Sequence, residues 1–146
     1  MTVKEVEVLL VEDNPNDQEL TLRALKRKNL CNRIHVVGDG AEALDFLFGK
    51  GQYAGRTTAD LPKVVLLDIK LPKINGIEVL QKVKADPVLR TLPIVMLTSS
   101  KEGPDVQECY RLGANSYIVK PVDFDKFTEA VVNLGFYWLL TNEPPK

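Results

Sequence analysis

The sequence has few cysteines, almost no net charge and no long hydrophobic run. Its 146 residues include two cysteines and one histidine, and 19 Lys plus Arg stand against 20 Asp plus Glu, for a formal net charge of −1. Cys31 and Cys109 lack metal-ligand spacing, which argues against a disulfide framework and favours a reducing compartment. The balanced charge gives no general reason to bind nucleic acid or an anionic membrane.

The chain also has no apolar stretch as long as a membrane span, and its first residues (MTVKE) do not resemble the start of a signal peptide. We therefore expect a cytoplasmic protein. A hydrophobic fraction of 45% and a charged fraction of 27% fit one compact domain. We place that domain at residues 1–140, with a short tail at 141–146 and no output domain.

Five short apolar runs alternate with amphipathic segments, which predicts a parallel sheet covered by helices. The runs are Val8–Val11, Ile34–Val37, Val64–Leu67, Ile94–Leu97 and Tyr117–Val119. The first, third and fourth are uniformly apolar, as strands buried on both faces should be, whereas the second contains His35 and the fifth is short. These features predict an α/β, flavodoxin-like, doubly wound sheet of five strands in the order 2-1-3-4-5, with five helices.

The helices are predicted from apolar residues that recur at helical spacing. They cover Asp17–Lys28 with Leu20, Ala24 and Leu25 on one face, Ala41–Phe48 with Ala43, Leu44, Leu47 and Phe48, Ile77–Lys84, Asp105–Leu112, and the chain from Asp123 onward. The connection from Gly49 to Pro62 is long, and we expect an exposed loop, more readily a tolerated insertion than a partner contact.

Two local patterns have competing interpretations. Gly38-x-Gly40-x-x-Ala43 matches a dinucleotide-binding fingerprint, but its position after a predicted edge strand favours a simple helix start at Asp39-Gly40. His35 could be a ligand, but a lone histidine on a strand is more often structural.

Polar residues follow the central strands at the end where a parallel sheet collects them. Glu12-Asp13, Asp68, Thr98 and Lys120 each come at the end of a predicted strand, so they should converge at one edge. Crowded carboxylates need raised pKa values or a cation, and an all-oxygen site suits Mg²⁺. A carboxylate beside Mg²⁺, an ammonium and a hydroxyl is arranged for phosphoryl transfer.

The sequence resembles the receiver domain of two-component response regulators. The matching segments are VLLVEDNP (8–15), LLDIKLPKINGIEVL (66–80), IVMLTSS (94–100) and GANSYIVKP (113–121), together with the helix that follows. They cover nearly the whole chain in the family's order. The resemblance implies phosphorylation by a histidine kinase and signalling through the face made by the fourth helix, fifth strand and fifth helix.

The resemblance also implies a role for individual residues. Asp68 would be the phosphoacceptor, and Thr98 and Lys120 would contact the phosphoryl group. Glu12, Asp13, Asp68 and the backbone carbonyl of Lys70 would hold Mg²⁺, with Asp13 the stronger candidate of the acidic pair for direct contact. Tyr117 would be the switch aromatic, Gly76 would open the third helix, and the Lys120–Pro121 peptide would be cis.

A narrower resemblance points to the stand-alone receivers that are paired with bacterial and cyanobacterial phytochromes. It rests on the long loop and on the segment FYWLL at 136–140. Consecutive apolar residues on a helix cannot all face one core, so we expect an exposed apolar surface there, for a homodimer or another protein partner. The output would be a protein contact or onward phosphotransfer to a downstream protein.

Two other functions compete with a receiver. A Mg²⁺-dependent phosphatase with an aspartyl intermediate would normally carry a second Asp two residues after the nucleophile, where this chain has Lys70. A binding module independent of phosphorylation should lack one of the site residues, and none is missing. The receiver, which is not an enzyme, is therefore our prediction. The cognate kinase, its stimulus, the target and the lifetime of the phosphorylated state stay open.

Overall fold

The computed structural model describes residues 7–26, 33–56, 61–99 and 104–133. The strands are β1 (Val8–Val11), β2 (Ile34–Val37), β3 (Val64–Asp68), β4 (Ile94–Thr98) and β5 (Ser116–Val119). The α-helices are α1 (Pro15–Lys26), α2 (Gly40–Phe48), α3 (Gly76–Ala85), α4 (Pro104–Arg111) and α5 (Phe124–Asn133), and short 3₁₀ turns lie at η2 (Gly51–Tyr53) and η4 (Leu89–Thr91). Each predicted strand and helix is present, with ends that differ by a few residues.

The five strands form one parallel sheet in the order β2-β1-β3-β4-β5, as predicted. In the register of the sheet Val11 lies beside Val37 and Leu67, and Asp68 lies beside Leu97. The carboxyl ends of the central strands therefore meet at the same edge, as the site prediction requires.

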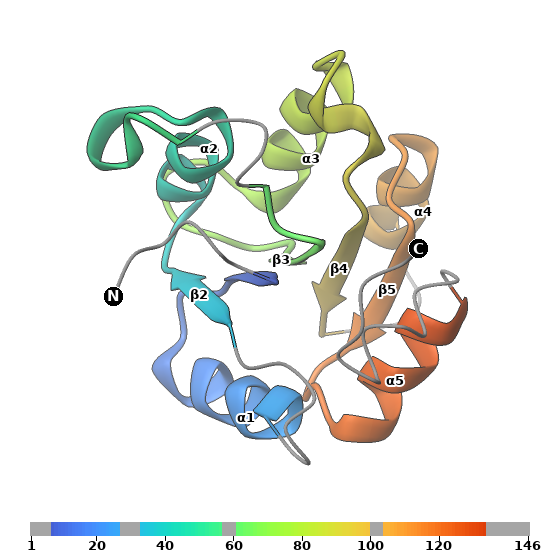
Figure 1. Ribbon diagram of the computed structural model, residues 1–146. Helices are drawn as coiled ribbons and strands as arrows, with labels where there is room; N and C mark the ends of the chain where they lie inside the picture. The colour runs from blue at the N-terminus through green and yellow to red at the C-terminus, as the bar shows by residue number, and fades with distance from the viewer. Residues whose placement is uncertain (1–6, 27–32, 57–60, 100–103, 134–146) are drawn as a thin grey trace, which may run out of the picture.

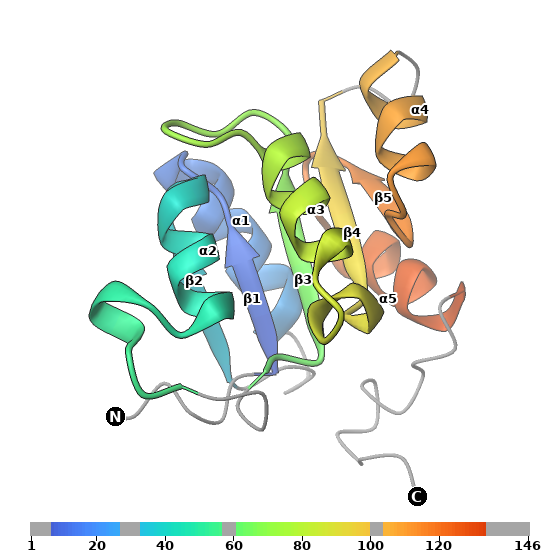
Figure 2. The same ribbon diagram turned by 90° about the horizontal axis from the view of Figure 1, so that it is seen from above.

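Helices cover both faces of the sheet (Figures 1 and 2). Helices α1 and α5 lie on one face, and α2, α3 and α4 lie on the other. Because strand side chains alternate between faces, β1 contributes Leu9 and Val11 to the larger core cluster and Val8 and Leu10 to the smaller one. All of β1, β3 and β4 is buried, which explains why these strands are apolar except for the site residues Asp68 and Thr98 at the ends of β3 and β4.

The long connection after α2 is not simply exposed, which corrects the prediction for its first part. Tyr53 in η2 is only 8% exposed and belongs to the larger core cluster. Its hydroxyl lies 2.8 Å from Nε2 of His35 and donates to Glu42 at 2.8 Å, and its ring packs edge-on against Phe46. His35 stacks on Phe46 with ring centroids 4.8 Å apart, so the structural interpretation of this histidine is confirmed.

Two predicted helix faces were partly wrong. Leu20 is 46% exposed, because α1 turns Thr21, Ala24 and Leu25 toward the sheet and Leu20 away from it. In α2 the prediction omitted Phe46, which is fully buried because the edge strand and the η2 turn cover that side of the helix.

The glycine pattern after β2 is a helix start. The side chain of Asp39 caps α2 by accepting a hydrogen bond from the backbone N–H of Glu42. A Cβ atom at Gly40 would lie 1.7 Å from the carbonyl oxygen of Ile74, so only glycine fits where α2 meets the loop after β3. This packing accounts for the motif without a dinucleotide.

Several expectations fall outside the described residues: Cys31, the aromatic segment at 136–140, the tail at 141–146 and residues 57–60 of the long loop. Within the described part of the chain, no helix is both long enough and apolar enough to cross a lipid bilayer.

Candidate functional site

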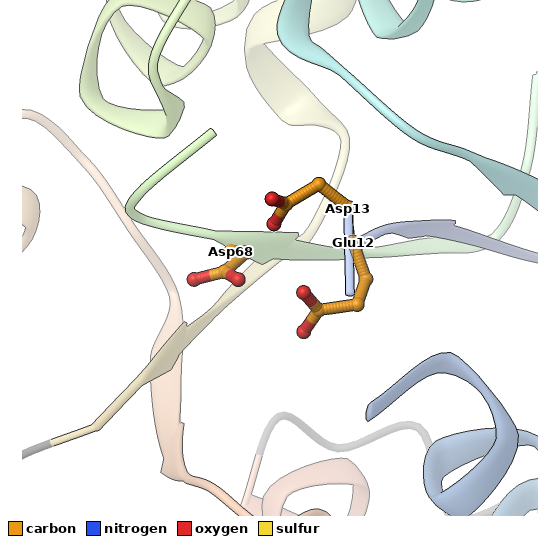
Figure 3. Close-up of side chains that lie close together, drawn as sticks. All are labelled: Glu12, Asp13 and Asp68. Carbon is orange, nitrogen blue, oxygen red and sulfur yellow. The ribbon is translucent and has the colours of Figure 1, made fainter. Parts of the chain in front are cut away.

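Three carboxylates converge at the carboxyl ends of β1 and β3 (Figure 3). Glu12 and Asp13 directly follow β1, and Asp68 is the last residue of β3. One oxygen from each of the three lies within 4.8 Å of the others. Glu12 is fully buried and Asp68 is 5% exposed, whereas Asp13 is exposed. The site therefore has a buried floor and one carboxylate open to solvent.

Lys120 reaches these carboxylates from the end of β5. Its Nζ donates to Oδ2 of Asp68 at 2.9 Å and to Oε1 of Glu12 at 3.0 Å. Its backbone N–H donates to the carbonyl of Thr98 at 2.7 Å, which ties the residue to the end of β4. The Lys120–Pro121 peptide is cis, as expected from the family resemblance.

The electrostatics of the pocket reflect the burial of charged side chains close to one another. The pKa of Glu12 is raised to about 7, because burial and the nearby carboxylate of Asp68 outweigh the hydrogen bonds from Lys120 and from the N–H of Asn14, which lower it. Burial alone would lower the pKa of Lys120, but its bonds to Asp68 and Glu12 outweigh burial and the pKa is raised. Lys120 therefore stays an ammonium, and the carboxylates favour a further cation.

The start of α1 holds Glu12 in place. The side chain of Asn14 accepts from the N–H groups of Asn16 and Asp17 at 2.9 and 3.0 Å, so Asn14 caps the helix. Glu12 accepts from the N–H of Asn14 at 3.2 Å, and its carbonyl accepts from the side chain of Gln18 at 2.6 Å. The fully buried carboxylate is thus supported by the cap as well as by Lys120.

The loop after β3 needs a glycine close to Asp68. A Cβ at Gly76 would lie 2.0 Å from the carbonyl oxygen of Asp68, so α3 can begin this close to β3 only with glycine. Lys70 is exposed, and its N–H donates to Oδ1 of Asp68 at 3.3 Å. A metal-binding role for the Lys70 carbonyl stays a prediction.

Thr98 and Tyr117 lie on the neighbouring strands. Thr98 ends β4 one residue past the partner of Asp68 and is 7% exposed. Tyr117 on β5 is paired with Met96 and half-buried, and its ring packs edge-on against Tyr110 of α4 with centroids 5.8 Å apart. Both residues lie on the strands that the prediction gave them, and their functional roles stay predictions.

The sequence interpretation missed Asp17, whose Oδ2 accepts from Lys120 Nζ at 3.1 Å. It lies 103 positions before Lys120 in the chain. An acidic residue in the first turn of a helix is ordinary, because it complements the helix dipole. The only signal in the sequence was its position shortly after Glu12-Asp13.

Residues 8–132 match the family described as response regulator receiver domain. The chain belongs to this family. It is 40% identical over 138 residues to a probable methanogenesis regulatory protein, FilR2, of Methanothrix harundinacea, covering 94% of this chain and 86% of FilR2. The receiver prediction is thereby confirmed, and the acidic pocket is that of a receiver.

Solved structures of response regulators, one of them a bacteriophytochrome response regulator, are similar to this receiver over almost its whole length. The bacteriophytochrome response regulator RtBRR is 52% identical, with a TM-score of 0.85 over 97% of this chain and 84% of RtBRR. The Mn²⁺-bound form of the response regulator Rcp1 is 33% identical, with a TM-score of 0.76 over 97% of this chain and 99% of that one. The predicted likeness to phytochrome-associated receivers is therefore confirmed.

The acidic cluster fits a small, hard divalent cation. Its donors are all carboxylate oxygens, and two of the three carboxylates are almost completely buried. Such a donor set, with few protein ligands and one side open to water, is what Mg²⁺ prefers. An excess of negative charge in a largely buried pocket gives the physical reason for a cation there.

Proposed function

We propose that this receiver takes a phosphoryl group from a histidine kinase onto Asp68, in a reaction that depends on Mg²⁺. The observation that carries the proposal is the contact of Lys120 Nζ with Asp68 Oδ2 at 2.9 Å, beside the cluster of Glu12, Asp13 and Asp68. A nearly buried carboxylate that touches an ammonium and adjoins a cation site is suited to accept a phosphoryl group.

The transfer requires one bond to form and one to break. An Asp68 oxygen attacks the phosphorus of the donor phosphohistidine, the P–N bond breaks, and the imidazole nitrogen keeps the electron pair and takes up a proton. Lys120 neutralises negative charge on the phosphoryl oxygens, and the hydroxyl of Thr98 donates a hydrogen bond to one of them. These residues bind and orient the group but do not react.

Glu12, Asp13 and Asp68, with the carbonyl of Lys70, are the residues that we assign to Mg²⁺. The ion supplies positive charge that offsets the charge of the phosphoryl group. The three carboxylates support this assignment because they lie within 4.8 Å of one another. Mn²⁺ in the Rcp1 structure supports a divalent cation in a related protein.

The signal is a population shift. We propose that a phosphoryl group on Asp68 draws Thr98 toward it and lets Tyr117 change rotamer, which remodels the face made by α4, β5 and α5. The edge contact of Tyr117 with Tyr110 of α4 supports a link between the switch residue and that face. The output is then contact with a downstream protein or a phosphotransfer protein, and a homodimer is one form that contact can take.

The partner kinase that we propose is of the phytochrome type, and we place the reaction in the cytoplasm. The likeness to RtBRR, at 52% identity, supports the first part. The test is phosphotransfer from purified phytochrome kinases compared with other histidine kinases. Equal or faster transfer from kinases without a phytochrome module would contradict the pairing and leave the receiver function intact.

A phosphatase and a passive binding module are the alternatives. The exposed Lys70 stands where a phosphatase of the aspartyl type would carry its general acid, which argues against turnover. A passive module has no need for the ammonium contact on Asp68. We therefore assign no enzymatic activity on external substrates to the chain.

One experiment separates the three functions. The protein is incubated with acetyl phosphate, with and without Mg²⁺, and its intact mass is followed over time. A receiver gains one labile phosphoryl group that depends on Mg²⁺, and Asp68→Asn does not gain it. Rapid multiple turnover of phosphate monoesters would instead support the phosphatase, and no adduct at all would support the passive module.

A further inference from the structure

The ammonium of Lys120 donates to three carboxylates. The proposed function gives a role to two of them, those of Glu12 and Asp68, and none to the third. Beyond Glu12 and Asp68, Oδ2 of Asp17 in the first turn of α1 accepts from Nζ at 3.1 Å. The ammonium side chain is 19% exposed, and those of Glu12, Asp68 and Asp17 are 0%, 7% and 33% exposed. Asp17 is thus the partner nearest to solvent.

Both partners of the Asp17–Lys120 contact are held in place by hydrogen bonds of their own backbone. The N–H of Asp17 is fixed by the Asn14 cap, and the backbone of Lys120 is fixed by its bond to the carbonyl of Thr98. The contact therefore joins two anchored points, the start of α1 and the end of β5.

An ammonium has only three N–H donors, and here each of the three carboxylates receives one. A phosphoryl group on Asp68 needs at least one of these donors. One existing bond must then be given up, and the bond to Asp17 costs least because water replaces Lys120 there most easily.

We propose that Asp17 is a positioning residue that competes with the phosphoryl group for Lys120. It holds the ammonium toward α1 in the unphosphorylated state and so weakens the capture of an anionic phosphodonor. This inference rests on the proposed function of Asp68 and Lys120. It predicts that the chain binds phosphodonors less tightly than the same site without Asp17.

The test measures the rate of Asp68 phosphorylation as a function of acetyl phosphate concentration at saturating Mg²⁺. Asp17→Asn keeps the shape of the side chain and removes its charge. Breaking a partly exposed ion pair should lower the half-saturating acetyl phosphate concentration by about two- to fivefold. The maximal rate should change less than this. Asp17→Glu, which restores the charge, should return the value toward that of the parent.

A matched control separates the contact from the general effect of charge. Glu19→Gln removes one charge from the same helix, at an exposed residue that pairs with Arg23 and not with Lys120. It should leave the half-saturating concentration near that of the parent. Beryllofluoride with Mg²⁺, a stable analogue of the phosphoryl group, should show the same order of affinities by calorimetry.

An unchanged or higher half-saturating concentration in Asp17→Asn would overturn the inference, as would an equal decrease in Glu19→Gln. Thermal unfolding of each variant checks that it is folded. If the parent gains no phosphoryl group on Asp68, the proposed function itself fails. If the parent is phosphorylated and Asp17→Asn behaves as the parent does, only the role of Asp17 fails.

Discussion

The carboxyl edge of the sheet and the outer side of β2 both hold polar side chains in protected positions, but they balance charge differently. At the carboxyl edge the carboxylates of Glu12, Asp17 and Asp68 contact one ammonium, that of Lys120, and a fourth carboxylate, that of Asp13, adjoins Glu12 and Asp68. Beside β2, a hydrogen-bonded series runs from His35 through Tyr53 to Glu42, and Arg56 lies 3.9 Å above the Phe46 ring.

This difference in charge balance distinguishes a functional site from a structural cluster. The second group satisfies its own hydrogen bonds and charges, and it fixes the η2 turn against α2. The first has more carboxylates than cationic side chains among the described residues, which favours an external cation and fits the proposed phosphorylation of Asp68. Substitutions at the β2 cluster should therefore lower the free energy of unfolding, whereas substitutions at the carboxyl edge should lower the rate of phosphorylation.

The largest expected effect is on stability at the β2 cluster. Phe46→Ala removes a fully buried ring that contacts His35 and Tyr53, and should cost about 3–5 kcal/mol of unfolding free energy. Urea denaturation followed by circular dichroism measures it. Leu20→Ala, at an exposed residue, is the control and should stay within about 0.5 kcal/mol. An equal loss of unfolding free energy in the two variants would show that the β2 cluster contributes no more to stability than an exposed residue does.

The next effect is on chemistry at the carboxyl edge. Lys120→Ala removes the ammonium that contacts Asp68, and should slow phosphorylation by acetyl phosphate by about 10²–10³-fold. The time course of intact mass gives the rate, with Lys82→Ala at an exposed position as control. A rate that stays close to the parent's would mean that Lys120 does not contact the phosphoryl group.

A smaller effect concerns the cation. Mg²⁺ should stabilise the parent by about 1.4 kcal/mol at ten times its dissociation constant, because it binds the folded state only. Asp13→Asn removes the exposed carboxylate of the cluster and should abolish most of this gain, without loss of stability in the absence of Mg²⁺. Thermal unfolding with Mg²⁺ or with a chelator measures both. An undiminished Mg²⁺ effect in the variant would place the ion elsewhere.

The smallest effect is a pH dependence at the β2 cluster. Burial lowers the pKa of His35 below 6.5, and Arg56 lowers it too, although Glu42 opposes both. Protons then bind the unfolded chain more readily than the folded one, so stability is complete above pH 6.5 and falls as pH decreases toward the folded pKa. Glu12, whose pKa is raised to about 7, titrates in the same range in both proteins, so the informative quantity is their difference. By urea denaturation from pH 7.5 to 5, the parent should lose unfolding free energy relative to His35→Gln as the pH falls. If the unfolding free energy of the two proteins depends on pH in the same way, His35 does not contribute to the pH dependence of stability.

Much of the fold and the site could be predicted because both depend on local patterns. Uniformly apolar β-strands predicted which strands are central, and a parallel sheet places every strand's carboxyl end at one edge. This was enough to bring Glu12, Asp13, Asp68, Thr98 and Lys120 together. The strand order followed from which runs contained polar residues.

The errors arose where a second element covers a surface that periodicity alone leaves open. Tyr53 was placed in an exposed loop, yet η2 folds back so that its ring meets Phe46 and its hydroxyl meets Glu42. Phe46 was omitted from the buried face of α2 for the same reason. Leu20 was placed on the same apolar face as Ala24 and Leu25, yet it is 46% exposed, because helical spacing cannot show how far around α1 the sheet extends.

The sequence alone determined the parallel sheet, its order and the identity of the acidic pocket, since these follow from apolar runs and from the residues at their ends. Only the tertiary structure decided that Lys120 is shared with Asp17 and that Tyr53 is internal. Both are contacts between groups far apart in the chain. Their existence depends on distances of a few ångströms between separate elements, and no pattern within one element encodes such distances.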